Sequence, residues 1–157
     1  MTKKMQEKLA WIMATWFGSG LSPKAPGTVG SLCSVPLAFI GFYFGTTAFF
    51  FTICALFLIG WWATRIVLRT QKQSDPGFVV IDETIGQSLT FALVVGGPCS
   101  LTVLIAGFLL FRLFDITKVW PASFFDRRVH TALGVMMDDV IAGLYAGVIL
   151  YGLTLFL

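Results

Sequence analysis

The longest stretches without a charged residue set the strongest limit on what this chain can fold into. Three such runs occur, of 40, 28 and 18 residues, covering Ala25 to Thr64, Thr84 to Phe111 and Val140 to Leu157. A membrane-spanning helix needs about 20 apolar residues, so the first run is long enough for two spans. Only 12% of the residues are charged, against roughly 25% in a soluble domain. A chain of 157 residues could not hide so much apolar helix in a soluble core, so we expect an integral membrane protein.

Breaks inside the apolar runs predict the number of helices. Gly45-Thr46-Thr47 divides the first run into helices near Val29–Phe44 and Ala48–Leu68. Gly96-Gly97-Pro98 divides the second run into pieces of about 12 and 13 residues, each too short to span a membrane, which favours a shallow hairpin over one kinked span. Basic residues flank both hairpins, so residues 65–83 and 112–139 are expected on the cytoplasmic side.

The N-terminal segment differs from the runs that follow it. Its first 17 residues combine three lysines with Trp11 and Trp16, which predicts an amphipathic helix at the membrane interface, and no cleavable signal peptide is evident. The three cysteines have no metal-ligand spacing and are interpreted as small core residues. The predicted fold is therefore all-α: one membrane-embedded domain, residues 1–157, forming a helical bundle of about four spans or helical hairpins after this interfacial helix.

Pairs of acidic residues stand where apolar helices begin. Asp138 and Asp139 precede the third uncharged run, and Asp82 and Glu83 precede the second. Neighbouring carboxylates raise the cost of ionising each other, and a divalent cation would relieve that cost. A solvated helix cap explains one such pair, but the recurrence is hard to explain by capping alone. Acidic residues at this depth are functional by default, and Asp115 joins them if the second run is a hairpin.

Basic and glycine-rich segments suit a phosphate group beside these acids. Arg112, Asp115 and Lys118 follow one another at intervals of three, so a helix would place them on one face. The segment from Gly18 to Ser31 holds four glycines and two prolines, and we expect it not to form a regular helix. Its backbone N–H groups and hydroxyls could meet a phosphate, although an ordinary turn before a helix fits the segment as well.

Together these side chains predict phosphoryl chemistry on a membrane lipid. Carboxylates without a Cys or His cluster suit Mg²⁺, with Mn²⁺ as an alternative. The chain has no Cys followed five residues later by Arg, no Asp-Gly-x-x-Ala-Arg signature, and one histidine, His130, where a two-histidine lipid phosphatase needs two. The mechanism that stays open is attack by metal-activated water with a carboxylate as base. His130 is interpreted as a surface residue.

Four segments of the chain resemble the phosphatidylglycerophosphatase A family. They are Ser19 to Leu32, Val80-Ile-Asp-Glu-Thr-Ile-Gly86, Phe111-Arg-Leu-Phe-Asp-Ile-Thr-Lys118 and Gly134-Val-Met-Met-Asp-Asp-Val-Ile-Ala-Gly143, in family order over nearly the whole chain. The resemblance implies a Mg²⁺-dependent bacterial inner-membrane enzyme that converts phosphatidylglycerophosphate into phosphatidylglycerol and phosphate. It implies metal or catalytic roles for Asp82, Glu83, Asp115, Asp138 and Asp139, and phosphate-binding roles for Gly27, Thr28, Ser31, Arg112 and Lys118.

Two departures from the family pattern concern loops. Lys118-Val-Trp-Pro121 stands where many members read Lys-Pro-Trp-Pro, and Thr131-Ala132 stands where they read Gly-Gly. Neither change removes a charge, so they bear on local loop shape.

The alternative to an enzyme is a small channel or transporter subunit with an acidic ion path. Such a path would need acids along the depth of the spans, whereas these cluster at one end.

Overall fold

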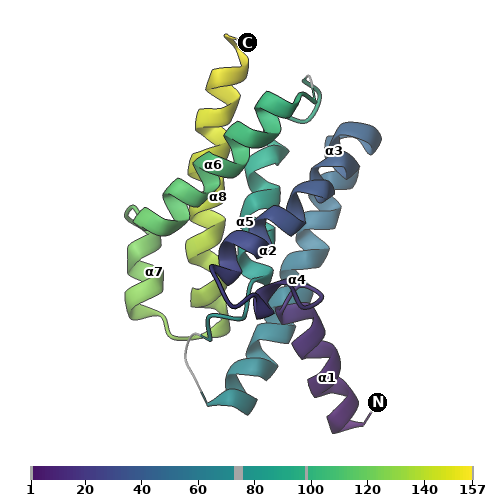
Figure 1. The fold of residues 1–157 in the computed structure, drawn as a ribbon, viewed down its shortest axis with the longest axis vertical. Coiled ribbons are helices and arrows are strands. Elements are labelled where there is room, and N and C mark those ends of the chain that lie inside the picture. The colour runs from purple at the N-terminus through teal and green to yellow at the C-terminus, as the bar shows by residue number, and fades with distance from the viewer. Residues whose placement is uncertain (1, 73–75, 98, 157) are drawn as a thin grey trace.

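The computed structural model describes residues 2–72, 76–97 and 99–156, and within them every named element is a helix (Figure 1). Pro98, in the predicted break of the second run, lies outside these ranges, as do residues 73–75. In chain order the elements are α1 (Lys3–Ala14), the 3-10 turn η1 (Ser19–Leu21), α2 (Pro26–Ser34), the 3-10 turn η2 (Val35–Leu37), α3 (Ala38–Phe44), α4 (Thr46–Gln71), α5 (Ile81–Ala92), α6 (Leu101–Thr117), α7 (Ala122–Arg128) and α8 (Ala132–Thr154).

Three helical stretches are long and apolar enough to cross a membrane. They are the continuous path of α2, η2 and α3 (Pro26–Phe44), then α4, and then α8. The chain turns at Gly45, between α3 and α4, as the sequence predicts. The polytopic all-α fold expected from the uncharged runs is therefore confirmed.

The second uncharged run forms the hairpin that its central break predicts. Helix α5 has 12 residues and α6 has 17, so each is shorter than a full span. Ser100 begins α6 by accepting a hydrogen bond from the Val103 N–H, at 3.2 Å. The two helices pack together where Gly107 meets the ring of Phe91. The start of α5 and the end of α6 therefore lie at the same end of the molecule.

Helix α5 lies at the centre of the bundle and is buried along most of its length. It packs most extensively against α8 and also against α2, α4 and α6. Glycines allow the α5–α8 contact to be very close: a Cβ at Gly143 would lie 2.2 Å from the Gly86 carbonyl oxygen, and a Cβ at Gly86 would lie 2.5 Å from the Asp139 carbonyl oxygen. Any larger side chain at either position would push the two helices apart.

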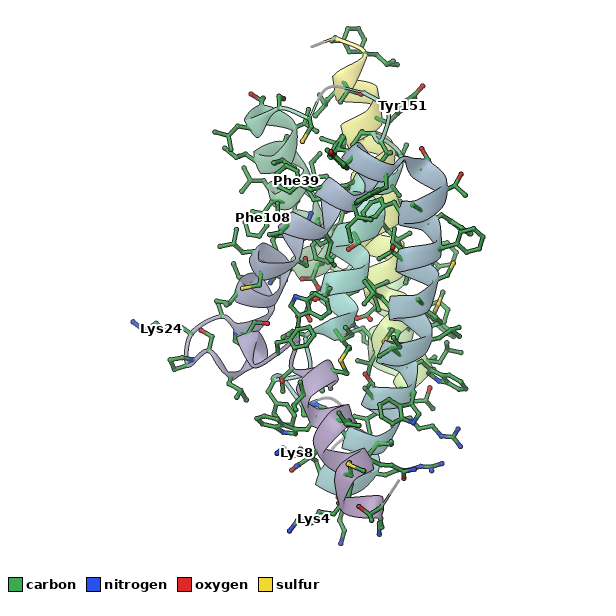
Figure 2. The ribbon with its side chains drawn as sticks, turned by 90° about the vertical axis from the view of Figure 1, so that its right-hand side faces the viewer. Lys4, Lys8, Lys24, Phe39, Phe108 and Tyr151 are labelled. Atoms are coloured by element: carbon green, nitrogen blue, oxygen red, sulfur yellow. The ribbon has the colours of Figure 1, made fainter. Side chains whose placement is uncertain are left out.

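The outer surface divides into a basic end and an apolar remainder. Figure 2 shows Lys4 and Lys8 at the lower end of the molecule, whereas Phe39, Phe108 and Tyr151 lie in its upper half. Large apolar side chains are exposed along α3, α4, α6 and α8. Exposed apolar area on this scale is typical of a surface in contact with lipid.

Two expectations from the sequence were wrong. Helix α2 already begins at Pro26, so the second half of the glycine-rich segment is helical; proline is favourable in the first helical turn, and small residues let α2 pack closely on its neighbours. The cysteines are not core residues, because Cys33, Cys54 and Cys99 are all exposed. On a membrane protein the outer surface is apolar as well, so a small apolar side chain does not indicate burial.

Single-cysteine labelling tests this arrangement. In a cysteine-free background, Lys72→Cys at the end of α4 and Arg128→Cys at the end of α7 should react with an impermeant maleimide from the same side of the membrane. Thr47→Cys, in the turn at the opposite end of α4, should react only from the other side. All three positions are exposed. Labelling of Lys72→Cys and Arg128→Cys from opposite sides would contradict the hairpin formed by α5 and α6.

Candidate active site

Three carboxylates meet at the basic end of the α5–α8 contact. Asp82 and Glu83 occupy the first turn of α5, and Asp139 lies in the second turn of α8. One oxygen from each lies within 4.8 Å of the others. Asp82 and Asp139 are buried, with 6% and 3% of their surface exposed. Acids from two separate apolar helices therefore form one cluster, because the close α5–α8 packing places the first turn of α5 beside the second turn of α8.

Two basic side chains from the end of α6 border this cluster. Arg112 forms an ion pair with Asp115, and Lys118 forms one with Asp138. The Lys118 Nζ atom also lies 3.5 Å from Asp115 Oδ1 and 3.7 Å from Asp139 Oδ1. Burial disfavours the charge on Lys118, but the surrounding carboxylates of Asp139, Asp138 and Asp115 raise its pKa above the usual value. Lys118 therefore stays protonated and acts as a fixed positive charge.

Helix α2 covers the cluster on another side. A Cβ at Gly27 would lie 2.2 Å from Glu83 Oε1, so only glycine leaves room for that carboxylate. The Ser31 hydroxyl donates to the Gly27 carbonyl at 2.7 Å and accepts from Arg112 Nη1 at 3.3 Å. Thr28 lies in the same helix, but within the described residues no hydrogen bond joins its hydroxyl to the site.

A cavity of about 130 Å³ opens beside the carboxylates. All five predicted acids and Lys118 line it, together with residues of the connection between α6 and α8. That connection supplies Asp126, which lies 3.7 Å from Lys118 Nζ, and His130. His130 is exposed, as expected of a surface residue, but it also borders the cavity, which the sequence reading did not anticipate. The sequence did hold one sign of this position: His130 lies between two predicted helices that both carry site residues.

Several buried polar atoms in and near the site have no hydrogen-bond partner within the described part of the chain. The acceptors are Glu83 Oε2, Asp138 Oδ1 and Asp139 Oδ1, and the donors include Arg112 Nε. The side-chain amide of Gln87, one turn after Glu83 on α5, is likewise unpaired. Buried polar groups normally find partners, so this set of atoms suits a site that binds both a cation and an anionic group. Gln87 was missed because one glutamine in an apolar run has no distinctive pattern.

Comparison with known proteins identifies the family. The family model described as phosphatidylglycerophosphatase A matches residues 12–154. The chain belongs to this family. Proteins named phosphatidylglycerophosphatase A from Escherichia coli and Haemophilus influenzae are each 34% identical to it, over 89% and 90% of this chain and 80% and 86% of their own lengths.

A third relative, from Bacteroides thetaiotaomicron, carries the provisional name phosphatidylinositol-3-phosphatase; it is 37% identical over 88% of this chain and 89% of its own length. No solved structure matches the chain. The chain is thus an enzyme of a phosphatase family, and these matches give no support to a channel or transporter subunit. The roles of the individual site residues stay predictions.

Replacing Gly27 by alanine tests the packing of α2 on Glu83. The added methyl group would displace the Glu83 carboxylate and would lie 3.3 Å from Arg112 Nη1. We expect kcat/KM for lipid phosphate hydrolysis to fall by about tenfold to a hundredfold, because misplacing a reacting group by about 1 Å can cost that much. The thermal unfolding midpoint should not fall, since alanine favours a helix more than glycine does.

Gly152→Ala is the matched control, because the space around a Cβ at Gly152 is open. That variant should retain full activity. If Gly27→Ala were as active as Gly152→Ala, Glu83 would not need its position against α2.

Proposed function

We propose that this protein hydrolyses phosphatidylglycerophosphate to phosphatidylglycerol and inorganic phosphate at the cytoplasmic face of a bacterial inner membrane, and that it requires Mg²⁺. The observation that carries the proposal is the meeting of Asp82, Glu83 and Asp139 oxygens within 4.8 Å, beside Lys118 and Arg112. The names of the Escherichia coli and Haemophilus influenzae relatives support the choice of substrate. The basic end of the bundle supports the cytoplasmic orientation.

The donor set fits Mg²⁺. It consists of hard carboxylate oxygens, and three of the buried acidic oxygens have no hydrogen-bond partner within the described residues. Asp82, Glu83 and Asp139 would hold the ion, with Asp138 and Asp115 beside them. The chemistry that Mg²⁺ supplies when bound is neutralisation of phosphoryl charge and an increase in the acidity of water.

The chain's own residues account for the remaining parts of the reaction. Lys118 and Arg112 bind the phosphate oxygens and stabilise the negative charge that grows during the reaction. A carboxylate of the cluster accepts a proton from the attacking water. The water oxygen forms a bond to phosphorus, the bond between phosphorus and the glycerol oxygen breaks, and that oxygen takes up a proton. The cavity beside the helix starts admits a headgroup, while the acyl chains stay in the surrounding lipid.

Phosphate release from purified protein in detergent tests the proposal. Phosphatidylglycerophosphate should be hydrolysed when Mg²⁺ is present, and a chelator should abolish the reaction reversibly. Phosphatidic acid and phosphatidylinositol 3-phosphate, assayed in parallel, should be poorer substrates. Hydrolysis that proceeds fully after metal has been removed would contradict the role given to the carboxylates, and a preference for phosphatidylinositol 3-phosphate would replace the proposed substrate with that of the third relative.

A double substitution tests whether the acids act as one unit. Asp82→Asn and Asp139→Asn should each lower kcat by about a hundredfold or more, and the double variant should be little worse than either one, because residues that serve one transition state fail together. Glu7→Gln, which removes an acid from α1, should leave activity unchanged. Two small defects that multiply in the double variant would show that Asp82 and Asp139 are independent groups.

The His130→Ala variant tests whether the histidine is a covalent nucleophile. His130 lines the cavity, so a phosphohistidine intermediate is sterically open to it. Under direct attack by water, His130→Ala should keep a substantial part of its activity. Complete loss of turnover in a folded variant would favour the phosphohistidine route.

Isotope labelling tests the alternative that a carboxylate attacks phosphorus. In a single turnover in ¹⁸O-labelled water, direct attack places the label in phosphate alone. An aspartyl or glutamyl phosphate that is cleaved at phosphorus would also label phosphate, but it would leave a phosphorylated peptide in an acid-quenched sample. We expect mass measurement of the quenched and digested protein to find none. A phosphorylated peptide carrying one of the five acids would overturn direct attack.

A further inference from the structure

A second hollow, of about 540 Å³, lies between α4 and the start of α8. Its lining includes Trp61, Arg65, Leu68 and Arg69 of α4 on one side, and His130 and Leu133 on the other. The two helices touch just above it, where Thr64 Oγ1 lies 4.0 Å from Met136 Sδ. We refer to this hollow as the α4–α8 groove. None of the described residues that line it is acidic.

The two arginines of the groove are available to an anion. Residues 61, 65, 68 and 69 share one face of α4, and the Arg65 guanidinium lies 5.8 Å from the centre of the Trp61 ring. Both arginines are exposed, and among the described residues neither forms a salt bridge. Arginine binds phosphate through paired N–H groups, and it tolerates apolar surroundings better than lysine does. Trp61, Leu68 and Leu133 add apolar surface beside these charges.

The α4–α8 groove borders the candidate active site. His130 lines both the groove and the carboxylate cavity. The proposed substrate carries two phosphates, a terminal monoester and a phosphodiester, and glycerol alone separates them. A monoester held among the carboxylates, Lys118 and Arg112 therefore leaves the phosphodiester close to the cavity edge, and the groove supplies positive charge at that edge.

We infer that the α4–α8 groove is a lipid-binding subsite in which Arg65 and Arg69 bind the phosphodiester of the substrate while Trp61, Leu68 and Leu133 contact its glycerol backbone and the start of its acyl chains. This inference rests on the proposed function. It makes Arg65 and Arg69 specificity-determining residues: they favour lipids that carry a phosphodiester next to the reacting monoester. It also predicts that the product phosphatidylglycerol, which retains the phosphodiester, binds at the groove.

The two subsites can be probed separately. Short-chain phosphatidylglycerol carries only the phosphodiester, and inorganic phosphate stands in for the monoester. In Arg65→Gln/Arg69→Gln, the Kd for short-chain phosphatidylglycerol, measured by calorimetry in detergent with a chelator present, should rise about tenfold. In assays of lipid phosphate hydrolysis with Mg²⁺ present, phosphatidylglycerol should inhibit competitively. The same double substitution should raise the Ki of phosphatidylglycerol by the same factor as the Kd, and it should leave the Ki of inorganic phosphate unchanged.

Arg127→Gln/Arg128→Gln is the matched control, because it removes the same two charges from exposed positions on α7 that line neither hollow. It should leave the Kd for phosphatidylglycerol unchanged, and Arg65→Lys/Arg69→Lys should recover part of the lost affinity. Equal weakening by Arg127→Gln/Arg128→Gln would show a general attraction of anionic lipid, and noncompetitive inhibition would show a lipid bound outside the substrate path; either result would overturn the inference. Absence of phosphatidylglycerophosphate hydrolysis by the unaltered protein would instead refute the proposed function. The two failures can be told apart, because the calorimetric comparison needs no turnover.

Discussion

The close contact between α5 and α8 is the constraint on which the rest of this structure depends. Gly86 and Gly143 let the two backbones approach until no Cβ would fit between them. Packing of small residues is a principal way for helices to associate in lipid, where no hydrophobic force drives apolar surfaces together. The same contact sets the distance between the acids of the two helices, so one packing choice determines both the fold and the spacing of Asp82, Glu83 and Asp139.

That spacing has an electrostatic cost, which the surrounding residues offset only in part. Burying several carboxylates together is unfavourable, because each disfavours the charge on the others and all lose contact with water. Lys118 and Arg112 compensate some of this charge through their ion pairs with Asp138 and Asp115. With Asp126, six acids line the cavity against the two cations, which is an excess of negative charge when all of them are ionised. The divalent ion that the site is proposed to hold would offset that excess. The phosphate group of a lipid would then complete the balance of charge.

Much of this arrangement could be predicted from the sequence, because charge in an apolar chain is a strong signal. The uncharged runs predicted the spans, and the break before Pro98 predicted the hairpin that brings Asp115 to the same end as Asp82. The start of α2 was not predicted, since glycine-rich segments adopt helix or turn depending on what packs against them, and Gly27 faces Glu83 only in the folded protein. The place of His130 beside the cavity was also inaccessible, because it depends on contacts between helices distant in sequence. Gln87 was missed for another reason: one glutamine in an apolar run has no distinctive pattern.

The central claim is that the carboxylates of α5 and α8 form a single divalent-cation site. Crystals grown with Mn²⁺ in place of Mg²⁺, with diffraction recorded at the manganese absorption edge, would test it most directly. The account predicts an anomalous peak among the side-chain oxygens of Asp82, Glu83 and Asp139, lost in Asp139→Asn crystals that keep the same helix packing. A peak elsewhere, or none here in crystals of enzyme that Mn²⁺ activates in solution, would contradict it.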